Sequence, residues 1–502
     1  MAKKNILFAL VVLMLFALIL PAAADVPAHK ETLVIGSNVD INNLNIYQQN
    51  DQINNIIIKL THDGLIFNGN DATMYLGNGL ALAESYEYTD ETHILWHLKQ
   101  GVTWSDGSPF TAEDVKFSYD MILDSPRAGT MKGYVGMEII DDYTFIMEVE
   151  GFNNEFVVQL SNPIQSKKAW ESGMEEPWLV GTGRYKVIEW VEGEYVKLEK
   201  VANHWDTERP AVSDYIIFRP ILEDSSRVIA LQNGEIDVCI LPPTNELYIL
   251  EEDPNVTVFQ RAGSRLFYFG FNVTKEPWNN KTLRQAVACA INRQDVIEVA
   301  VSGLGTPQTT ILNRGLWGFY DEMEGFNYDL DRAKALMAEA GYPDGGIKTT
   351  MLIANSSPYL SIAQVIQDNL KQIGITVELQ TVEDATLKSE CIAGNNELFL
   401  WRWNEDVTDD QVYRELYNTG MVNNYHHYSN PHIDELTDAI LVEPDQQKRY
   451  EIGVELQETL VEECPQVPLY IADLVIAYNK DLKGEYLYGG GNHNWSWAYI
   501  AE

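Results

Sequence analysis

The segment WNEDVTDD, residues 403–410, places a carboxylate three residues after a tryptophan and adds three further acids without a nearby lysine to neutralise them. The preceding run ELFLWRW (397–403) is apolar and aromatic, which is typical of a buried strand. An acidic loop that leaves a buried strand lies where ligand clefts are found in α/β proteins. We therefore interpret this segment, with Asp406 at its centre, as a pocket for the positive charge of a ligand.

Other interpretations of the segment remain open: a solvated acidic turn, a calcium loop, and an acid-rich helix start. The buried character of the preceding strand disfavours the solvated turn. An EF-hand calcium loop needs a glycine at its turn, and none follows Asp406 at that position. The pair Glu405 and Asp406 would also suit a glycosidase, but acids are so frequent in this chain that the pair carries little information.

Motifs for other chemistry are scarce. The sequence contains no G-x-S-x-G, H-E-x-x-H, Walker or dinucleotide-binding glycine pattern. Three of the nine histidines cluster, at His426, His427 and His432. A metal site at this cluster is an alternative to a polar loop.

The clearest element near the acidic segment is a helix, tight turn and strand over residues 361–380. Apolar residues from Ile362 to Leu370 recur on one helical face, Gly374 ends the helix, and apolar residues then alternate at the period of a strand. Further helices are predicted to start at Ala112 after a Thr-x-x-Asp cap, to run from about 281 to Gly303, and to cover 330–340.

Residues 181–240 show a different order of elements: a hairpin, a strand, a helix and another strand. This mixture indicates either an α+β protein or mixed α/β sheets, rather than a barrel or a solenoid. The length of the chain predicts two or three lobes. Because no low-complexity linker interrupts it, we expect crossing strands to join the lobes.

The first residues have the form of a secretory signal. Lys3 and Lys4 precede an apolar run from Ile6 to Leu20, and small residues surround a cleavage point after Ala24. We expect residues 1–24 to be removed and the remainder to be exported to the periplasm or the outer face of the cytoplasmic membrane, an uncleaved N-terminal anchor being the alternative. No cysteine follows the run, so a lipoprotein-type lipid is excluded.

Composition adds two constraints. The net charge of −39 repels nucleic acid and anionic lipid and favours cationic or zwitterionic ligands. Solubility or adaptation to salt accounts for most of this charge. The four cysteines, at 239, 289, 391 and 464, show no C-x-x-C spacing. We expect buried thiols, with one long-range disulfide as the alternative.

Six segments, in order along the chain, resemble blocks of the extracytoplasmic solute-binding proteins of ABC importers, in the family that carries peptides and nickel (family 5). The segments are 80–120, 181–187, 230–237, 283–297, 333–345 and 428–436. One departure is Arg184, which stands where the family's GTGPY turn usually has proline.

The resemblance implies an α/β (mixed α+β) fold: a two-lobed clamshell like the type II periplasmic binding proteins, with an extra inserted lobe. Lobe I would comprise 31–66, 180–271 and 470–502, the inserted lobe II 67–179, and lobe III 272–469. The crossings are expected near Phe271 and Tyr470. In this family the ligand is enclosed between lobes I and III by hinge closure.

The resemblance also implies a site. Family members that carry peptides have a Trp followed three residues later by an Asp that pairs with the peptide's N-terminal ammonium, and Trp403 and Asp406 match this spacing. Asp409 matches a second acid that is common in this block of the family. Two residues depart from the family: Glu405 stands where Gly is frequent, and Asp410 stands where Pro is frequent.

The remaining candidate ligand-binding residues are Trp401, Arg402 and Tyr425, with the aromatic rings as walls of side-chain pockets. The nickel carriers of the family lack the Asp and use His and Arg around a metal chelate. Arg402 with His426 or His427 keeps that alternative open.

We therefore expect a secreted, non-enzymatic protein that captures dipeptides or oligopeptides in an interlobe cleft and delivers them to the permease of an ABC transporter. A carrier of nickel or a metal chelate is the alternative, and a secreted hydrolase a third. We expect no cofactor, no nucleic-acid partner and a monomer. A hydrogen bond from an ammonium to a carboxylate is worth roughly 1.5–3 kcal/mol, so Asp406 would demand a free amine.

Overall fold

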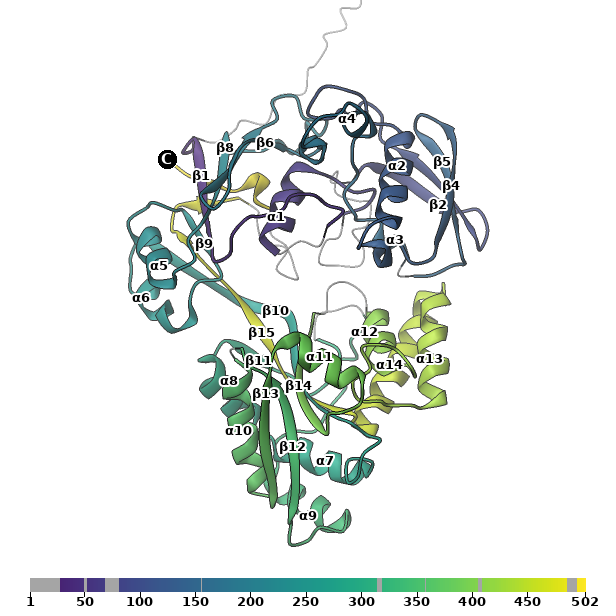
Figure 1. Cartoon of the computed structure of the whole chain (residues 1–502), viewed down its shortest axis with the longest axis vertical. Coiled ribbons are helices and arrows are strands. Elements are labelled where there is room, and N and C mark those ends of the chain that lie inside the picture. Colours follow the sequence, from purple (N-terminus) through teal and green to yellow (C-terminus); the bar gives the residue numbers. More distant parts are fainter. Residues whose placement is uncertain are drawn as a thin grey trace, which may run out of the picture.

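The computed structural model of the chain describes residues 28–48, 52–67, 81–154, 156–313, 318–356, 358–404, 409–484 and 494–502. Figure 1 shows two halves, one above the other, joined by the long strands β10 and β15. The predicted signal at 1–24 and the central acid, Asp406, lie outside the described residues.

One 11-stranded sheet passes through both halves, in the order β13-β12-β14-β10-β15-β9-β1-β8-β7-β6, with β11 paired to β15. Its strands are β1 (Thr32–Ser37), β6 (Tyr185–Val191), β7 (Tyr195–Lys200), β8 (Tyr215–Pro220), β9 (Val238–Ile240), β10 (Val256–Phe271), β11 (Gly305–Pro307), β12 (Ile347–Ala354), β13 (Ile375–Val382), β14 (Leu398–Asn404) and β15 (Gln466–Asn479). The mixed α/β class predicted from the order of elements is therefore confirmed.

The connection between the halves is the antiparallel pair β10 and β15, which stay paired from Val256↔Asn479 to Gly270↔Gln466. The register shifts between Ala262 and Arg265. Apolar residues 266–271 and 467–472 belong to one buried cluster, whereas Ile476 belongs to another. The division of the cores thus lies at about 262–265 and 473–475, several residues from the expected crossings near Phe271 and Tyr470. We call 265–472 the lower half and the remainder the upper half.

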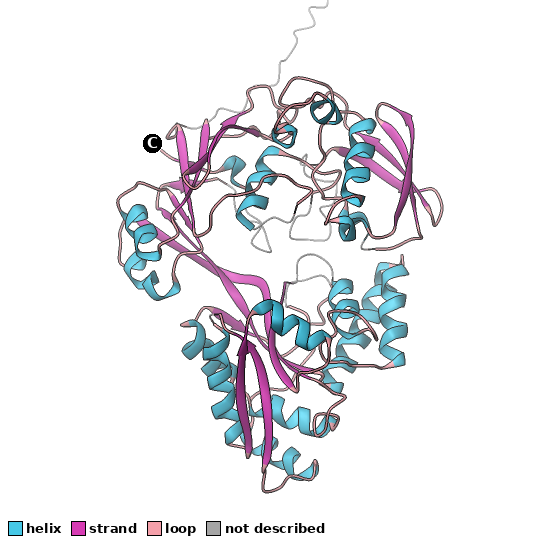
Figure 2. Ribbon diagram, in the orientation of Figure 1, coloured by secondary structure: helices cyan, strands magenta, loops and turns pink. Residues whose placement is uncertain are grey.

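The lower half carries most of the helices, on the flanks of β12, β13 and β14 (Figure 2). They are α7 (Lys281–Ala290), α8 (Arg293–Val301), α9 (Leu330–Glu339), α10 (Tyr359–Lys371), α11 (Asp384–Ile392), α12 (Asp409–Tyr417), α13 (Pro431–Val442) and α14 (Gln446–Glu463). The helix, turn and strand predicted over 361–380 are confirmed as α10, Gly374 with a φ of 79°, and β13.

The single helix predicted from about 281 to Gly303 is wrong, because the chain forms two helices there. Ile291 is extended, and the side chain of Asn292 accepts a hydrogen bond from the Gln294 backbone amide, which starts α8. An N-cap of this kind satisfies backbone donors that the helix leaves free, and so favours a new start over continuation.

The upper half contains α1 (Gln52–Thr61), α5 (Asp224–Gln232), α6 (Leu247–Glu251), β16 (Leu482–Lys483) and β17 (Tyr499–Ile500). It also holds an inserted lobe, residues 81–180, with a four-stranded sheet in the order β2-β3-β5-β4. The elements of this lobe are β2 (Ala83–Tyr88), β3 (His93–Leu98), β4 (Tyr134–Asp141), β5 (Thr144–Val149), α2 (Ala112–Leu123), α3 (Phe156–Gln159) and α4 (Lys167–Glu171). Short 3-10 turns cover Ala128–Met131, Pro177–Leu179, Thr244–Glu246 and Trp495–Trp497.

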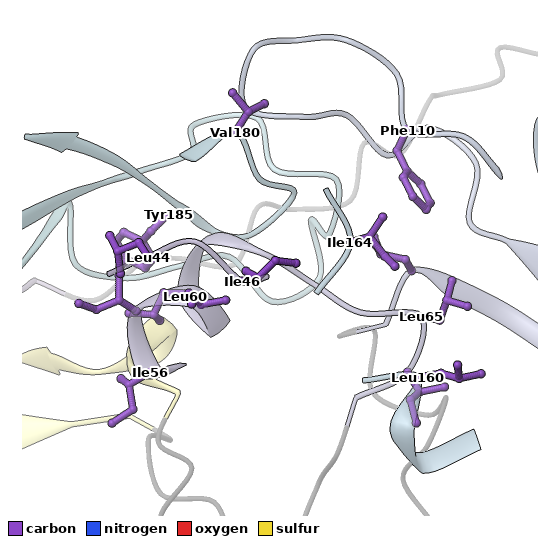
Figure 3. Packing of buried hydrophobic residues seen from close by; sticks show 14 of the residues in the cluster. Leu44, Ile46, Ile56, Leu60, Leu65, Phe110, Leu160, Ile164, Val180 and Tyr185 are labelled. Carbon is purple, nitrogen blue, oxygen red and sulfur yellow. The ribbon is translucent and has the colours of Figure 1, made fainter. Parts of the chain in front are cut away.

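The inserted lobe shares its hydrophobic core with the rest of the upper half. Figure 3 shows Leu44, Ile56 and Leu60 from the N-terminal segment in one cluster with Phe110 and Ile164 of the inserted lobe. The helix predicted to start at Ala112 is confirmed, and its cap includes a 2.9 Å hydrogen bond from the Thr111 amide to Asp114. These two parts of the upper half are therefore packed around one core.

All four cysteines are buried and free, as expected. In the part of the chain that the structure covers, no helix has both the length and the apolar character needed to cross a membrane.

Candidate functional site

The carboxyl ends of three parallel strands meet near the centre of the molecule. β12 pairs in parallel with both β13 and β14. The chain continues from β12 into α10, which begins at Tyr359, and from β13 into α11, which begins at Asp384. This edge of a parallel sheet is where α/β proteins bind ligands.

Arg402, near the end of β14, contacts both helix starts. Its Nη1 donates a hydrogen bond of 2.5 Å to the hydroxyl of Tyr359 and lies 3.4 Å from a carboxylate oxygen of Asp384. The side chain of Arg402 remains 34% exposed. Its guanidinium therefore has a fixed position and still faces solvent.

The aromatic candidates on the same strand are half-buried. Trp401 packs edge-on against Tyr425, with ring centroids 5.8 Å apart, and Trp403 lies between the two apolar clusters of the lower half. Tyr425 is only 2% exposed, and burial raises the pKa of its hydroxyl to about 12. Tyr425 thus supports Trp401 from the core side.

The acidic segment joins β14 to α12. The predicted strand is confirmed as β14, which ends at Asn404, and α12 begins at Asp409. Asp406 and Glu405 lie between these points, outside the described residues, and so do the side chains of Asp409 and Asp410. The structure establishes where the chain enters this segment, at the end of β14, and where it leaves it, at the start of α12.

A polar cavity of about 320 Å³ lies between the halves, beside α12. The inserted lobe contributes Lys132, Glu150 and Phe152 to its lining, and α12 contributes Arg414 and Glu415. The helix that follows the acidic segment therefore forms one side of an interlobe space.

The histidine cluster is dispersed in the fold. His426 is completely buried among the rings of Tyr268, Phe399 and Tyr417, and burial lowers its pKa to about 3. His427 Nε2 lies 2.9 Å from the carbonyl oxygen of Cys391, and His432 is exposed beside Glu455. Among the described residues, no group of three His, Cys, Asp or Glu side chains is placed to hold a metal ion.

Sequence reasoning missed the partners of Arg402 and the inserted-lobe side of the cavity. Asp384 follows the strand predicted to end near residue 380, and that position was an available signal, whereas the strand β12 that precedes Tyr359 was not predicted. No signal in the sequence marked Lys132 and Phe152, because their proximity to Arg414 depends on how distant segments of the chain pack.

Comparison with known proteins identifies one family of binding proteins. The model for the middle region of the bacterial extracellular solute-binding proteins, family 5, matches residues 79–425. A curated relative, the glutathione-binding protein GsiB of Salmonella typhi, is 29% identical over 492 residues, covering 92% of this chain and 93% of its own length.

Two solved structures show the same architecture. The substrate-binding protein CtaP of Listeria monocytogenes is 26% identical, with a TM-score of 0.83 over 94% of this chain and 100% of its own. The periplasmic binding protein DppA of Helicobacter pylori, in complex with the peptide STSA, is 25% identical, with a TM-score of 0.75 over 95% and 99%. The predicted two-lobed clamshell of the type II periplasmic binding proteins is thereby confirmed.

Proposed function

The chain belongs to family 5 of the bacterial extracellular solute-binding proteins, and on that premise we propose that it captures a peptide with a free amino terminus between its two halves. The cargo is then delivered to the permease subunits of an ABC transporter. The observation that supports the proposal is where the acidic segment begins and ends: it follows β14, at the edge of the parallel strands, and precedes α12, which lines the interlobe cavity.

Asp406 is the proposed partner of the ligand's ammonium. A binding protein that accepts varied side chains takes its affinity from what all peptides share, which is their termini and backbone. An ammonium held by a carboxylate forms a strong, charge-assisted hydrogen bond, and the same carboxylate left without a cation in a closed cleft loses solvation. Removal of the positive charge from the ligand is therefore expected to abolish most of the binding.

The other residues of the proposed site surround the pair formed by Asp406 and the ligand's ammonium. Trp403 and Trp401 form apolar walls, Tyr425 holds Trp401 from the core, and Asp409 adds negative potential at the start of α12. Arg402 is held by Tyr359 and Asp384. It presents a cation on the face of β14 opposite to that of Trp401 and Trp403. Neighbouring carboxylates and a separate guanidinium suit a zwitterionic ligand.

The relatives support a peptide as ligand. GsiB is named for glutathione, and DppA was solved with the peptide STSA. Glutathione also carries a free amine and carboxylates, so it belongs in any panel of test ligands. The nickel alternative lacks a specific observation in its favour, since His426 is buried and His427 is hydrogen-bonded. Export after removal of residues 1–24, and action as a monomer, complete the proposal.

Isothermal titration calorimetry tests it. Purified protein, unfolded and refolded to remove retained ligand, is titrated with a panel of dipeptides to pentapeptides and glutathione, and then with the N-acetylated form of each binder. We expect acetylation to weaken binding at least tenfold, which corresponds to the loss of about 1.4 kcal/mol. Equal affinity for free and acetylated peptides would remove Asp406 from the proposed role.

A matched pair of variants separates a specific contact from general charge. Asp406→Asn and Asp410→Asn remove the same charge from the same segment. We expect only Asp406→Asn to reduce the affinity for free peptides severalfold or more and to abolish the discrimination against acetylated ones. Equal effects of the two variants would indicate diffuse electrostatic attraction in place of a pairing.

A further inference from the structure

Asn154 of the inserted lobe is hydrogen-bonded to the end of a helix in the lower half. Its backbone amide donates to the carbonyl oxygen of Leu441 at 2.8 Å. Its side-chain Nδ2 donates to the carbonyl oxygens of Ile440 at 3.0 Å and Glu443 at 2.9 Å. The last four carbonyl groups of a helix have no partner within the helix, so one residue here supplies three hydrogen bonds to the end of α13.

This contact lies on the side of the molecule away from the crossing strands. In Figure 1 the strands β10 and β15 join the halves at one side, whereas α13 approaches the inserted lobe at the other. Among the described residues, the halves are therefore joined at the crossing strands and, separately, at Asn154, with the sheet edge of β12 and β14 in the lower half between these two places.

The contacted helix is also tied to the candidate site. Asn418, just after α12, donates a hydrogen bond of 2.8 Å to Thr437 of α13, and Arg414 of α12 forms an ion pair of 3.7 Å with Asp438. Buried residues of α12 and α13 belong to one apolar cluster, so the two helices are packed together. Since α12 begins at the end of the acidic segment, this pair of helices lies between Asn154 and that segment.

We propose that Asn154 is a second pivot between the halves, and so a positioning residue for ligand capture. A body attached at one place can swing and twist in several directions, whereas a body attached at two places rotates mainly about the line that joins them. The contact confines the relative motion of the halves to one opening and closing rotation.

The polar cavity beside this contact is consistent with a pivot. Its lining comes from both halves, with Lys132 and Phe152 on one side and Arg414, Glu415 and Leu441 on the other. Leu441 is also the acceptor of the Asn154 amide. The contact therefore joins the two sides of this space at Leu441.

The proposal makes a statement about the ligand-free protein and does not depend on which ligand is bound. Spin labels placed at Ile140→Cys on β4 and Glu451→Cys on α14 report the distance between the halves by double electron–electron resonance. Both positions are exposed, and the four native cysteines are buried and so do not compete for the label.

We expect Asn154→Ala to broaden the distance distribution clearly relative to the parent. Asn154→Asp should broaden it at least as much, because its carboxylate faces the carbonyl end of a helix, where negative charge is unfavourable. The matched control is Asn395→Ala, which removes a 2.8 Å hydrogen bond to Glu390 inside the lower half. This control should leave the distribution unchanged.

Thermal unfolding of each variant accompanies the distance measurement. Retained cooperative unfolding with a broadened distribution supports the pivot. An unchanged distribution in both Asn154 variants, whether or not their melting temperature falls, would reduce the contact to a structural one and overturn the proposal. The proposal also fails if Asn395→Ala broadens the distribution as much as Asn154→Ala does.

Discussion

Arg184 forms a buried ion pair with Asp206 at the position where the family turn usually has proline. The side chains are 3% and 7% exposed. The guanidinium also donates through Nε to the carbonyl oxygen of Arg209 at 3.0 Å and lies over the ring of Trp497. The departure from the family sequence thus brings its own set of partners and ties the turn to the C-terminal segment.

Loss of one member of this pair should destabilise the protein strongly. Asp206→Asn removes the charge that Asp206 places beside a buried guanidinium, and we expect a loss of about 3 kcal/mol in the free energy of unfolding. The control is Asp120→Asn, which breaks the exposed pair with Lys116 and should change stability by about 0.5 kcal/mol or less. Urea denaturation of both variants measures this, and equal small effects would contradict the buried pairing.

Gly181 should be irreplaceable for a steric reason. A Cβ atom at this position would lie 1.8 Å from the carbonyl oxygen of Thr61 at the end of α1, and backbone cannot move aside easily. We expect Gly181→Ala to prevent folding or to lower stability by several kcal/mol. Gly136→Ala, where a Cβ meets nothing within 4 Å, is the control and should be nearly neutral. A well-folded Gly181→Ala protein with an unchanged urea midpoint would refute this close approach.

His426 predicts a dependence of stability on pH. Burial lowers its pKa from 6.5 to about 3, so the folded protein keeps the ring neutral while the unfolded chain binds a proton below pH 6.5. Its contribution to stability is complete above pH 6.5 and falls as the pH decreases toward 3. At pH 5 the loss amounts to about 2 kcal/mol.

His426→Phe removes this titration and should lose about 2 kcal/mol less stability than the parent between pH 7 and pH 5, as measured by denaturation at both values. In the control variant, the exposed His432 is replaced by Gln. Its difference in stability between pH 7 and pH 5 should equal that of the parent. A His426→Phe protein with the parent's acid sensitivity would show that the ring is not held neutral.

Nickel should bind weakly or not at all. His426 has no exposed surface, and His427 is hydrogen-bonded to the backbone at Cys391. We expect no shift of the melting temperature with Ni²⁺ plus a small chelator such as histidine. A shift of several degrees that disappears in the double variant His426→Ala, His427→Ala would instead favour a metal-chelate carrier.

Local patterns predicted the fold well where neighbouring residues decide the structure. The helix start at Ala112, the turn at Gly374 and the strand before the acidic segment all follow from caps, glycine conformation and hydrophobic period. The break between α7 and α8 was missed because Asn292 lies inside an apolar helical pattern, where its capping role is indistinguishable from a polar surface position.

Long-range contacts were beyond the reach of such patterns. Asn154 and Ile440 are 286 positions apart in the chain, and nothing in either segment marks the other as a partner. The same holds for the burial of His426, which depends on rings brought in from three other elements. The proposed role of Asp406 comes from family spacing and remains a prediction.

The most direct test of the central claim is a crystal structure of the protein with a bound peptide. The account predicts a carboxylate oxygen of Asp406 at about 2.7–2.9 Å from the ligand's ammonium nitrogen, enclosed between the two halves. A complex in which that carboxylate faces bulk water, with the peptide's amino terminus held elsewhere, would contradict it.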